Sequence, residues 1–299
     1  MRAVTFDRYG PPEVLTVAER TMPRPGPQDI LVRVAAVAVN PVDVAVRRGD
    51  IPSPLLPAVV GWDVSGTVVE AGPRATRFRA GDRVIAARSP LSTGAGVSAE
   101  FVALDESLAA HAPVGVPLEE AAALPLAALT AEQALAQLGP DCGRLLVAGA
   151  GGAVGGFVVQ LAALRGWRPS GLARGGDAAA VAALGACEVF SDLDAPPAGA
   201  FDVVIDAAGR PETVAAVREG GRYLSLTPFA VPEPERSVTV DIYGVRTDGS
   251  MLGTLARTVD AGHLTLRIAH VLPFEDAQKA HALLEGGGIR GKILLTPDT

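Results

Sequence analysis

The fold of this chain is decided by residues 144–163, which read RLLVAGAGGAVGGFVVQLAA. The short apolar run at residues 145–148 predicts a buried strand of a parallel sheet. Glycines follow it, and then apolar residues recur at helical spacing, at Val154, Phe157, Val158, Leu161 and Ala162. A strand, a glycine turn and a helix in this order are the context in which a glycine motif gains meaning.

The glycines of this turn follow the pattern Gly-x-x-Gly-x-x-Gly at Gly149, Gly152 and Gly155, which differs from the strict dinucleotide fingerprint. Glycines let the backbone approach a pyrophosphate, and the first amides of the helix after Gly152 point their donors toward it. The pattern therefore favours phosphate recognition. The alternative is a glycine-rich strand–helix turn without a ligand.

Length and composition limit the remaining possibilities. The chain has 299 residues, which suggests about two domains, and 26 basic against 33 acidic residues give a net charge of −7. An acidic chain without a basic run has no electrostatic reason to bind nucleic acid. Two cysteines without a CxxC pair exclude a disulfide framework and a four-cysteine zinc lobe. Without a signal peptide or a long apolar run, we expect no membrane span and a cytoplasmic location.

The first 110 residues or so are rich in short strands. Apolar or β-branched runs separated by Pro and Gly occur at residues 4–6, 15–17, 30–39, 66–71, 83–86 and 99–104. Such a series predicts a compact barrel or sandwich. One helix is expected inside it, at residues 42–48, because Asn40 can cap it, Asp43 can answer the cap and Gly49 can end it. Capping alone explains the residue types at Asn40 and Asp43.

The chain after residue 117 becomes helical and then alternates. Helices are predicted at residues 118–124 and 127–138, broken at Pro125. After the glycine turn, the predicted strands are 170–173, 188–190, 201–206, 222–226 and 238–243, and the predicted helices are 177–184, 213–218 and 249–261. This alternation predicts an α/β fold with a doubly wound parallel sheet. The tail (strand 268–272, helix 274–284, strand 292–295) is expected to pack back on the first domain.

The cofactor type is suggested by the residues after the second strand of the sheet. An NAD-preferring site offers Asp or Glu there, about twenty residues after the glycine turn. This chain has Leu172, Ala173, Arg174 and two glycines instead. A guanidinium matches a 2′-phosphate, so the sequence favours NADP(H), with Arg174 as the selecting residue. The alternative for Arg174 is a solvated surface side chain.

Other chemistries find no support in the sequence. The four histidines are scattered and none has ligand spacing to another His or Cys. No Ser or Cys lies in a Gly-x-Ser-x-Gly elbow. The remaining chemistry is hydride transfer, which a bound cofactor carries.

A series of motifs along nearly the whole chain resembles the medium-chain dehydrogenase/reductase superfamily, and within it the zinc-independent quinone oxidoreductase branch. Besides the glycine turn, these motifs are residues 9–15 (YGPPEVL), 40–43 (NPVD), 61–66 (GWDVSG), 81–84 (GDRV), 121–126 (AAALPL), 201–206 (FDVVID) and 291–293 (GKI). The resemblance implies a GroES-like β-barrel domain at residues 1–117, a Rossmann NADP-binding domain at 118–262 and a C-terminal segment, 263–299, that completes the first domain.

The resemblance also implies an activity and a set of contacts. The activity is NADPH-dependent reduction of a small-molecule quinone or α,β-unsaturated carbonyl, usually by a homodimer. Asn40 and Lys292 would face the nicotinamide. The other cofactor contacts would come from Thr130, Gly152, Ala153, Val154, Gly155, Ala207, Ala208, Thr227 and Phe229.

Departures from the family pattern bear on the mechanism. Zinc-dependent relatives carry a Cys near Asn40 and a Gly-His-Glu where this chain has Gly61-Trp62-Asp63, which favours a metal-free reaction. Tyrosines found in many relatives are replaced by Ala45 and Ile51. Asn40 or a backbone amide would then polarise the substrate carbonyl and water would supply the proton, while Trp62 either lines the pocket or packs in the core. An NADPH-binding sensor or scaffold with little turnover, and a tailoring enoyl reductase, are the alternatives.

Overall fold

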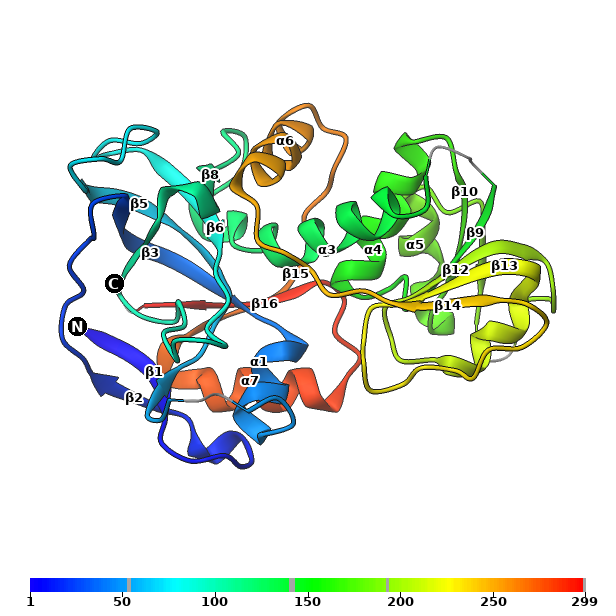
Figure 1. The fold of residues 1–299 in the computed structure, drawn as a ribbon, viewed down its shortest axis with the longest axis horizontal. Coiled ribbons are helices and arrows are strands. Elements are labelled where there is room, and N and C mark those ends of the chain that lie inside the picture. The colour runs from blue at the N-terminus through cyan, green and yellow to red at the C-terminus, as the bar shows by residue number, and fades with distance from the viewer. Residues whose placement is uncertain (53–54, 140–142, 192–193, 298–299) are drawn as a thin grey trace. The chain divides into compact units, whose positions relative to one another are not determined.

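The structure is a computed structural model that describes residues 1–52, 55–139, 143–191 and 194–297 (Figure 1). The chain forms two compact units. The barrel unit comprises residues 1–126, 247–262 and 266–299, and the parallel-sheet unit comprises residues 127–246 and 263–265. The domain boundaries expected from the sequence, at residues 117 and 262, stay a prediction. The compact units differ from them in grouping residues 118–126 and 247–262 with the barrel.

The parallel-sheet unit is built on six strands. They are β9 (Arg144–Ala148), β10 (Arg168–Leu172), β11 (Glu188–Phe190), β12 (Phe201–Asp206), β13 (Val217–Ser225) and β14 (Thr239–Ile242). Their order in the sheet is β11-β10-β9-β12-β13-β14, and every pair is parallel. The predicted doubly wound sheet is confirmed. The order reverses between β9 and β12, which is where such sheets bind ligands, outside the carboxyl ends of the strands.

The helices of residues 118–216 differ from the prediction at two places. The region contains α2 (Leu118–Ala121), α3 (Pro125–Ala136), α4 (Ala153–Leu164), the short η3 (Gly175–Asp177), α5 (Ala178–Ala183) and η4 (Pro211–Ala216). The predicted helix at residues 213–218 was wrong, because the chain there forms the 3₁₀ helix η4 and enters β13 at Val217. Pro125 does not break a helix but begins α3, where its missing N–H has no intrahelical partner to lose.

The barrel unit contains two sheets. One has the order β2-β1-β4, and the other β15-β16-β3-β5-β6-β8, with β7 also pairing with β3. The strands are β1 (Arg2–Phe6), β2 (Thr16–Glu19), β3 (Asp29–Val39), β4 (Ala58–Val59), β5 (Asp63–Ala71), β6 (Arg83–Ala87), β7 (Phe101–Asp105), β8 (Ala109–His111), β15 (Ile268–Pro273) and β16 (Lys292–Thr296). Because β16 pairs antiparallel with β3, the tail adds to the sheet begun by the N-terminal region.

Besides α2, three α-helices and three short 3₁₀ helices of the described residues belong to the barrel unit. They are α1 (Pro41–Arg48), α6 (Gly249–Asp260), α7 (Ala277–Gly286), η1 (Pro12–Val14), η2 (Glu106–Leu108) and η5 (Phe274–Asp276). The capping signals at the start of α1 work as predicted: the Asn40 N–H donates to Asp43 Oδ2 at 2.8 Å, completing a capping box. Gly49 ends the helix with φ of 90°, a conformation that favours glycine.

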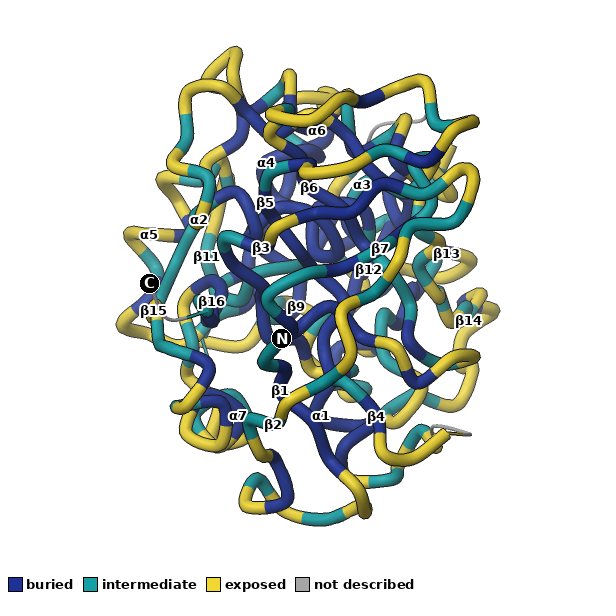
Figure 2. Tube along the Cα trace, turned by 90° about the vertical axis from the view of Figure 1, so that its left-hand side faces the viewer, coloured by how far each residue is buried: buried dark blue, intermediate teal, exposed yellow. Residues whose placement is uncertain are grey.

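Each unit has its own apolar core. In the barrel unit, Phe6, Ile30, Val64, Phe274 and Ile293 come from distant parts of the chain and are almost fully buried. Figure 2 shows the buried backbone along β3 and β5. In the parallel-sheet unit, the core is formed by β9, β12 and β13. None of the helices in the described residues has the length and apolar character needed to cross a membrane.

Candidate active site

The glycine turn is a backbone-lined cradle at the carboxyl end of β9. Gly149 has φ of 79°, and the Gly152 N–H donates to its carbonyl at 2.9 Å. Gly152 is the residue before α4, whose first turn is Ala153, Val154 and Gly155. A Cβ added at Gly155 would lie 2.2 Å from the Gly149 oxygen, so only glycine permits this tight turn. The first amides of a helix lack intrahelical acceptors, which is why anions are often bound at a helix start of this kind.

The loop after β12 meets this cradle. Asp206, the last residue of β12, accepts hydrogen bonds from the N–H groups of Ala208 (2.9 Å) and Arg210 (2.6 Å) and from the Tyr223 hydroxyl (2.7 Å). A Cβ added at Gly149 would lie 2.7 Å from Ala208 Cβ, so the loop approaches the glycine turn as closely as a glycine allows. Burial raises the pKa of Tyr223, so its hydroxyl stays a donor. The structure thus brings Ala207 and Ala208 beside the glycine turn.

The other predicted cofactor residues of this unit also follow strand ends. Arg174 is exposed two residues after β10, and none of the ion pairs within the described residues involves it. Thr227 and Phe229 follow β13, and Phe229 is 62% exposed. Thr130 lies within α3. These residues belong to the same unit as the glycine turn.

One acidic residue near the turn was not identified from the sequence. Asp177 is buried before α5, and its Oδ2 lies 3.0 Å from where a Cβ at Gly151 would be. An acid was expected directly after the second strand, whereas the short helix η3 brings Asp177 back toward the turn. Its capping position before a helical run was the only signal that could have found it.

In the barrel unit, Asn40, Asp63 and Lys292 form a buried polar cluster. Lys292 Nζ donates to Asp63 Oδ2 at 2.8 Å and to Asn40 Oδ1. The Asn40 side-chain amide donates to Asp63 Oδ2 at 3.0 Å and to the Ala38 carbonyl at 3.1 Å. Asp63 Oδ1 accepts the Leu126 N–H at 2.6 Å, close to the start of α3. Both N–H groups of the Asn40 amide are therefore engaged within this unit, and Asp63, the shared partner of Asn40 and Lys292, was not identified from the sequence.

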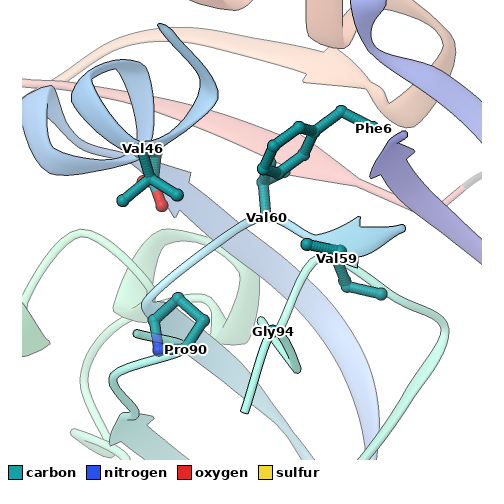
Figure 3. A pocket seen from close by; sticks show the side chains of 8 residues that line it. Phe6, Val46, Val59, Val60, Pro90 and Gly94 are labelled. Atoms are coloured by element: carbon teal, nitrogen blue, oxygen red, sulfur yellow. The ribbon is translucent and has the colours of Figure 1, made fainter. Parts of the chain in front are cut away.

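Asp43 lies beside this cluster. Its two oxygens accept the N–H groups of Asn40 and Gly61, the latter at 3.1 Å. Burial, reinforced by the negative charge of Asp63, raises the pKa of Asp43 to about 7. Asp43 also borders a cavity of about 10 Å³ between α1, β4 and Pro90, seen in Figure 3, which is about the size of one water molecule.

Trp62 precedes Asp63 and is only 6% exposed. Its backbone carbonyl accepts the Arg88 N–H at 2.9 Å, while its indole N–H has no hydrogen-bond partner within the described residues. Trp62 therefore packs in the core of the barrel unit in this structure. Its assignment to catalysis stays a prediction.

Comparison with known proteins agrees with this architecture. Residues 26–114 match the alcohol dehydrogenase GroES-like domain, and residues 184–295 match the family described as zinc-binding dehydrogenase. The chain is 32% identical to a 2-methylene-furan-3-one reductase of Solanum lycopersicum, over 99% of this chain and 79% of the relative. It is 30% identical to an NADPH-dependent alkenal/one oxidoreductase of Arabidopsis thaliana, over 99% of this chain and 80% of that one.

The chain belongs to the medium-chain dehydrogenase/reductase superfamily. A solved structure of Escherichia coli quinone oxidoreductase complexed with NADPH superposes with a TM-score of 0.90 at 26% identity, covering 99% of this chain and 100% of that one. The structural match extends over both units. As a member of this superfamily with quinone and enone reductases as homologues, the protein is an oxidoreductase.

Some members of this superfamily bind zinc, but the described residues of this chain do not form a zinc site. Within the described part of the chain, no group of three or more His, Cys, Asp or Glu side chains could hold a metal ion. At the Gly61-Trp62-Asp63 motif the one carboxylate already binds Lys292, Asn40 and Leu126. Zinc prefers thiolate and imidazole ligands, which this cluster lacks.

Proposed function

We propose that this protein binds NADPH and transfers hydride to a quinone or an α,β-unsaturated carbonyl without a metal ion. The glycine cradle carries the proposal. It lies at the point where the strand order reverses, and a Cβ at Gly155 would collide with the Gly149 carbonyl. The cradle suits a pyrophosphate because Gly149, Gly152 and Gly155 carry no side chains that would keep an anion from the backbone at the start of α4. The names of an NADPH-dependent relative and of an NADPH-complexed structural neighbour support the same cofactor.

Different residues around the cradle would bind different parts of NADPH. The amides of Ala153, Val154 and Gly155 would hold the pyrophosphate, and Gly152, whose N–H donates to the Gly149 carbonyl, would let it approach the backbone. Arg174 would pair with a 2′-phosphate. Asp206 fixes the loop after β12 through the N–H groups of Ala208 and Arg210, and the Tyr223 hydroxyl on β13 holds the Asp206 carboxylate, so this wall of the site is formed before the cofactor arrives. The bound nicotinamide supplies the hydride. Thr130, Thr227 and Phe229 stay proposed contacts.

The polar cluster of the barrel unit is assigned a positioning role. Asn40 was expected to polarise the substrate carbonyl, but both of its N–H groups donate to Asp63 and Ala38. We therefore assign Asn40 the orientation of the Lys292 ammonium, whose third N–H is not engaged within the described residues. A backbone amide would then polarise the carbonyl and water would supply the proton. A quinone suits this site, since its reduced oxygen is a stabilised phenolate.

Substitution at Gly155 tests the cofactor site. Gly155→Ala should raise the dissociation constant for NADPH roughly ten-fold or more, because the added Cβ displaces the Gly149 carbonyl and opens the turn. Calorimetric titration measures it. Gly244→Ala is the matched control, since a Cβ there meets nothing within 4 Å. If thermal melting shows that both variants are folded, an unchanged affinity of Gly155→Ala for NADPH would refute the assignment.

Turnover distinguishes an enzyme from a binding protein. With saturating NADPH, loss of its absorbance should follow addition of members of a quinone panel, and more slowly of an enone panel. Tight NADPH binding without oxidation by either panel would instead identify a sensor or scaffold.

Arg174 tests the choice between the two nicotinamide cofactors. Arg174→Ala should raise KM for NADPH by about ten-fold while leaving KM for NADH nearly unchanged, because one charge-assisted pair to the 2′-phosphate is lost. Steady-state assays with both cofactors measure the ratio. Arg168→Ala, an exposed arginine at the start of β10, is the control. An unchanged ratio would show that Arg174 is only a solvated surface residue.

We further propose that the protein acts as a homodimer in the cytoplasm. The support for dimerisation is β14, which is the last strand at one edge of the parallel sheet and carries an exposed Ile242. An edge strand presents unpaired N–H and C=O groups to a second copy.

A further inference from the structure

A large groove in the barrel unit is not used by the proposed reaction. It has a volume of about 590 Å³ and lies between α6, β8 and the loop at Arg77 and Phe78. We call it the α6 groove; in Figure 1, α6 lies beside β8. The groove shares no lining residue with the glycine turn or with the Asn40–Asp63–Lys292 cluster. Its volume is within the range of small-molecule sites.

The groove exists because the facing side of α6 carries small residues. Gly249, Gly253 and Ala256 follow one another at spacings of four and three and line it. Gly249 packs tightly, since a Cβ there would lie 2.4 Å from the carbonyl oxygens of Ser107 and Ala109. At Gly253, by contrast, a Cβ would make only ordinary contacts of 3.7 Å. Space therefore opens along the helix from Gly253 onward, and a side chain at this position would enter it.

Two arginines give the groove a positive character. Arg77 donates to the carbonyls of Glu106 (2.7 Å) and Ala109 (3.2 Å) and lies 5.2 Å from the centre of the Phe78 ring. Arg257 donates to the Thr254 hydroxyl at 3.0 Å. Neither guanidinium forms an ion pair within the described residues. Hydrogen bonds and the Arg77 charge lower the pKa of Asp105, which does not line the groove, so both guanidinium groups stay available to a ligand as charged donors.

The carboxylate that lines the groove, Asp260, already accepts hydrogen bonds from the backbone. Asp260 Oδ1 accepts the N–H groups of Val114 (2.8 Å) and Gly115 (3.0 Å), which fastens that loop to the end of α6. Apolar surface comes from Val114, which is 82% exposed, and from Phe78, which packs edge-on against His111 at 5.0 Å, while Ser250 adds a polar group. An anionic group on an apolar, planar body matches these walls and the guanidinium groups.

We propose that the α6 groove binds a small organic anion with an aromatic body, which Arg257 and Arg77 hold by its carboxylate or similar group. The proposal does not depend on the cofactor or on the hydride acceptor. The probe is 2-naphthoate, and the uncharged 2-naphthalenemethanol is its matched control. Titration of the full-length protein, followed by the amide resonances of Gly253 and Val114 in heteronuclear NMR with NADP⁺ present, should give saturable shifts for the anion alone.

Two substitutions test the groove in different ways. Gly253→Met should abolish the saturable shifts by filling the space, whereas Gly253→Ala should retain them. Arg257→Gln should weaken binding about ten-fold or more through loss of a charge-assisted contact. Arg74→Gln, an exposed arginine that does not line the groove, should change nothing.

The outcomes decide the proposal without reference to turnover. Equal binding of naphthalenemethanol, shifts that never saturate, or unchanged binding in both Gly253→Met and Arg257→Gln would overturn it. Because the readout is binding at α6 and β8, a failure here leaves the assignment of NADPH to the glycine turn untouched.

Discussion

At the scale of single residues, His281 and Arg47 are the least expected members of the barrel core. His281 is 1% exposed on α7 and Arg47 is fully buried on α1, where its Nη2 donates to Glu285 at 2.6 Å. Burial, together with the positive charge of Arg47, lowers the pKa of His281 to about 3. The imidazole is therefore neutral in the folded protein at any pH near neutrality.

His281 should make the protein sensitive to mild acid. Its pKa falls from 6.5 in the unfolded chain to about 3 in the folded protein, so its contribution to stability is complete above pH 6.5 and is lost as the pH falls toward 3. Between pH 6.5 and 5, wild type should lose about 2 kcal/mol more unfolding free energy than His281→Gln. Urea unfolding at both pH values measures this difference. The exposed His263→Gln is the control, and parallel pH profiles for wild type and His281→Gln would contradict the expectation.

Asp43 acts in the opposite direction over an overlapping range. Its pKa rises from 3.8 to about 7 on folding, so the stability it contributes is complete below pH 3.8 and is lost as the pH rises through 7. The two residues therefore partly compensate between pH 3.8 and 6.5. Comparing wild type with His281→Gln isolates the contribution of His281 to the pH dependence of stability, because Asp43 is the same in both proteins.

At the scale of elements, Asp63 connects four segments of the barrel unit. It lies at the start of β5 and binds Lys292 on β16, Asn40 before α1 and the Leu126 N–H near the start of α3. In most helices an N-cap residue accepts the hydrogen bond of an early amide. For α3, the Asp63 carboxylate on β5 accepts the Leu126 N–H instead. An ammonium and a carboxylate with 5% and 0% exposure can coexist only because each also has further hydrogen bonds.

Replacing one partner of the Lys292–Asp63 ion pair should lower the unfolding free energy more than replacing both partners. Lys292→Met should lower the unfolding free energy by about 3–5 kcal/mol, because the Asp63 charge is left buried without its cation. The double variant Lys292→Met with Asp63→Asn should be more stable than the sum of the two single changes predicts. Denaturant unfolding without cofactor measures all four proteins. Lys279→Met, at an exposed ion pair, is the control, and strict additivity would contradict the coupling.

At the scale of the whole molecule, the parallel sheet ends in an edge strand that a second copy of the chain can cover. The last strand, β14, carries Ile242 with 56% exposure. If two copies pair along β14, light scattering should give twice the 30.5 kDa mass of one chain, and Ile242→Lys should give the single mass. Val271→Lys, at an exposed position on the edge strand β15 of the barrel unit, is the matched control. A wild type of 30.5 kDa would refute the homodimer.

The sequence by itself determined the features that depend on near neighbours in the chain. The glycine turn before α4 and the capped helix from Asn40 to Gly49 are encoded within a few residues each, so their patterns predicted them correctly. The alternation of strands and helices predicted the parallel sheet for the same reason. The error at residues 213–218 occurred because a helical composition there yields to the pairing of β13 with β12.

Only the tertiary structure decided which polar side chains share a partner. Asp63 meets Leu126 and Lys292 across 63 and 229 residues of chain, and no local pattern encodes such a meeting. The same is true of Asp177 beside Gly151 and of the small-residue face of α6 that leaves a groove against β8. Local propensity and spacing act over one or two turns, whereas burial and charge pairing depend on which strands the folded sheet places side by side.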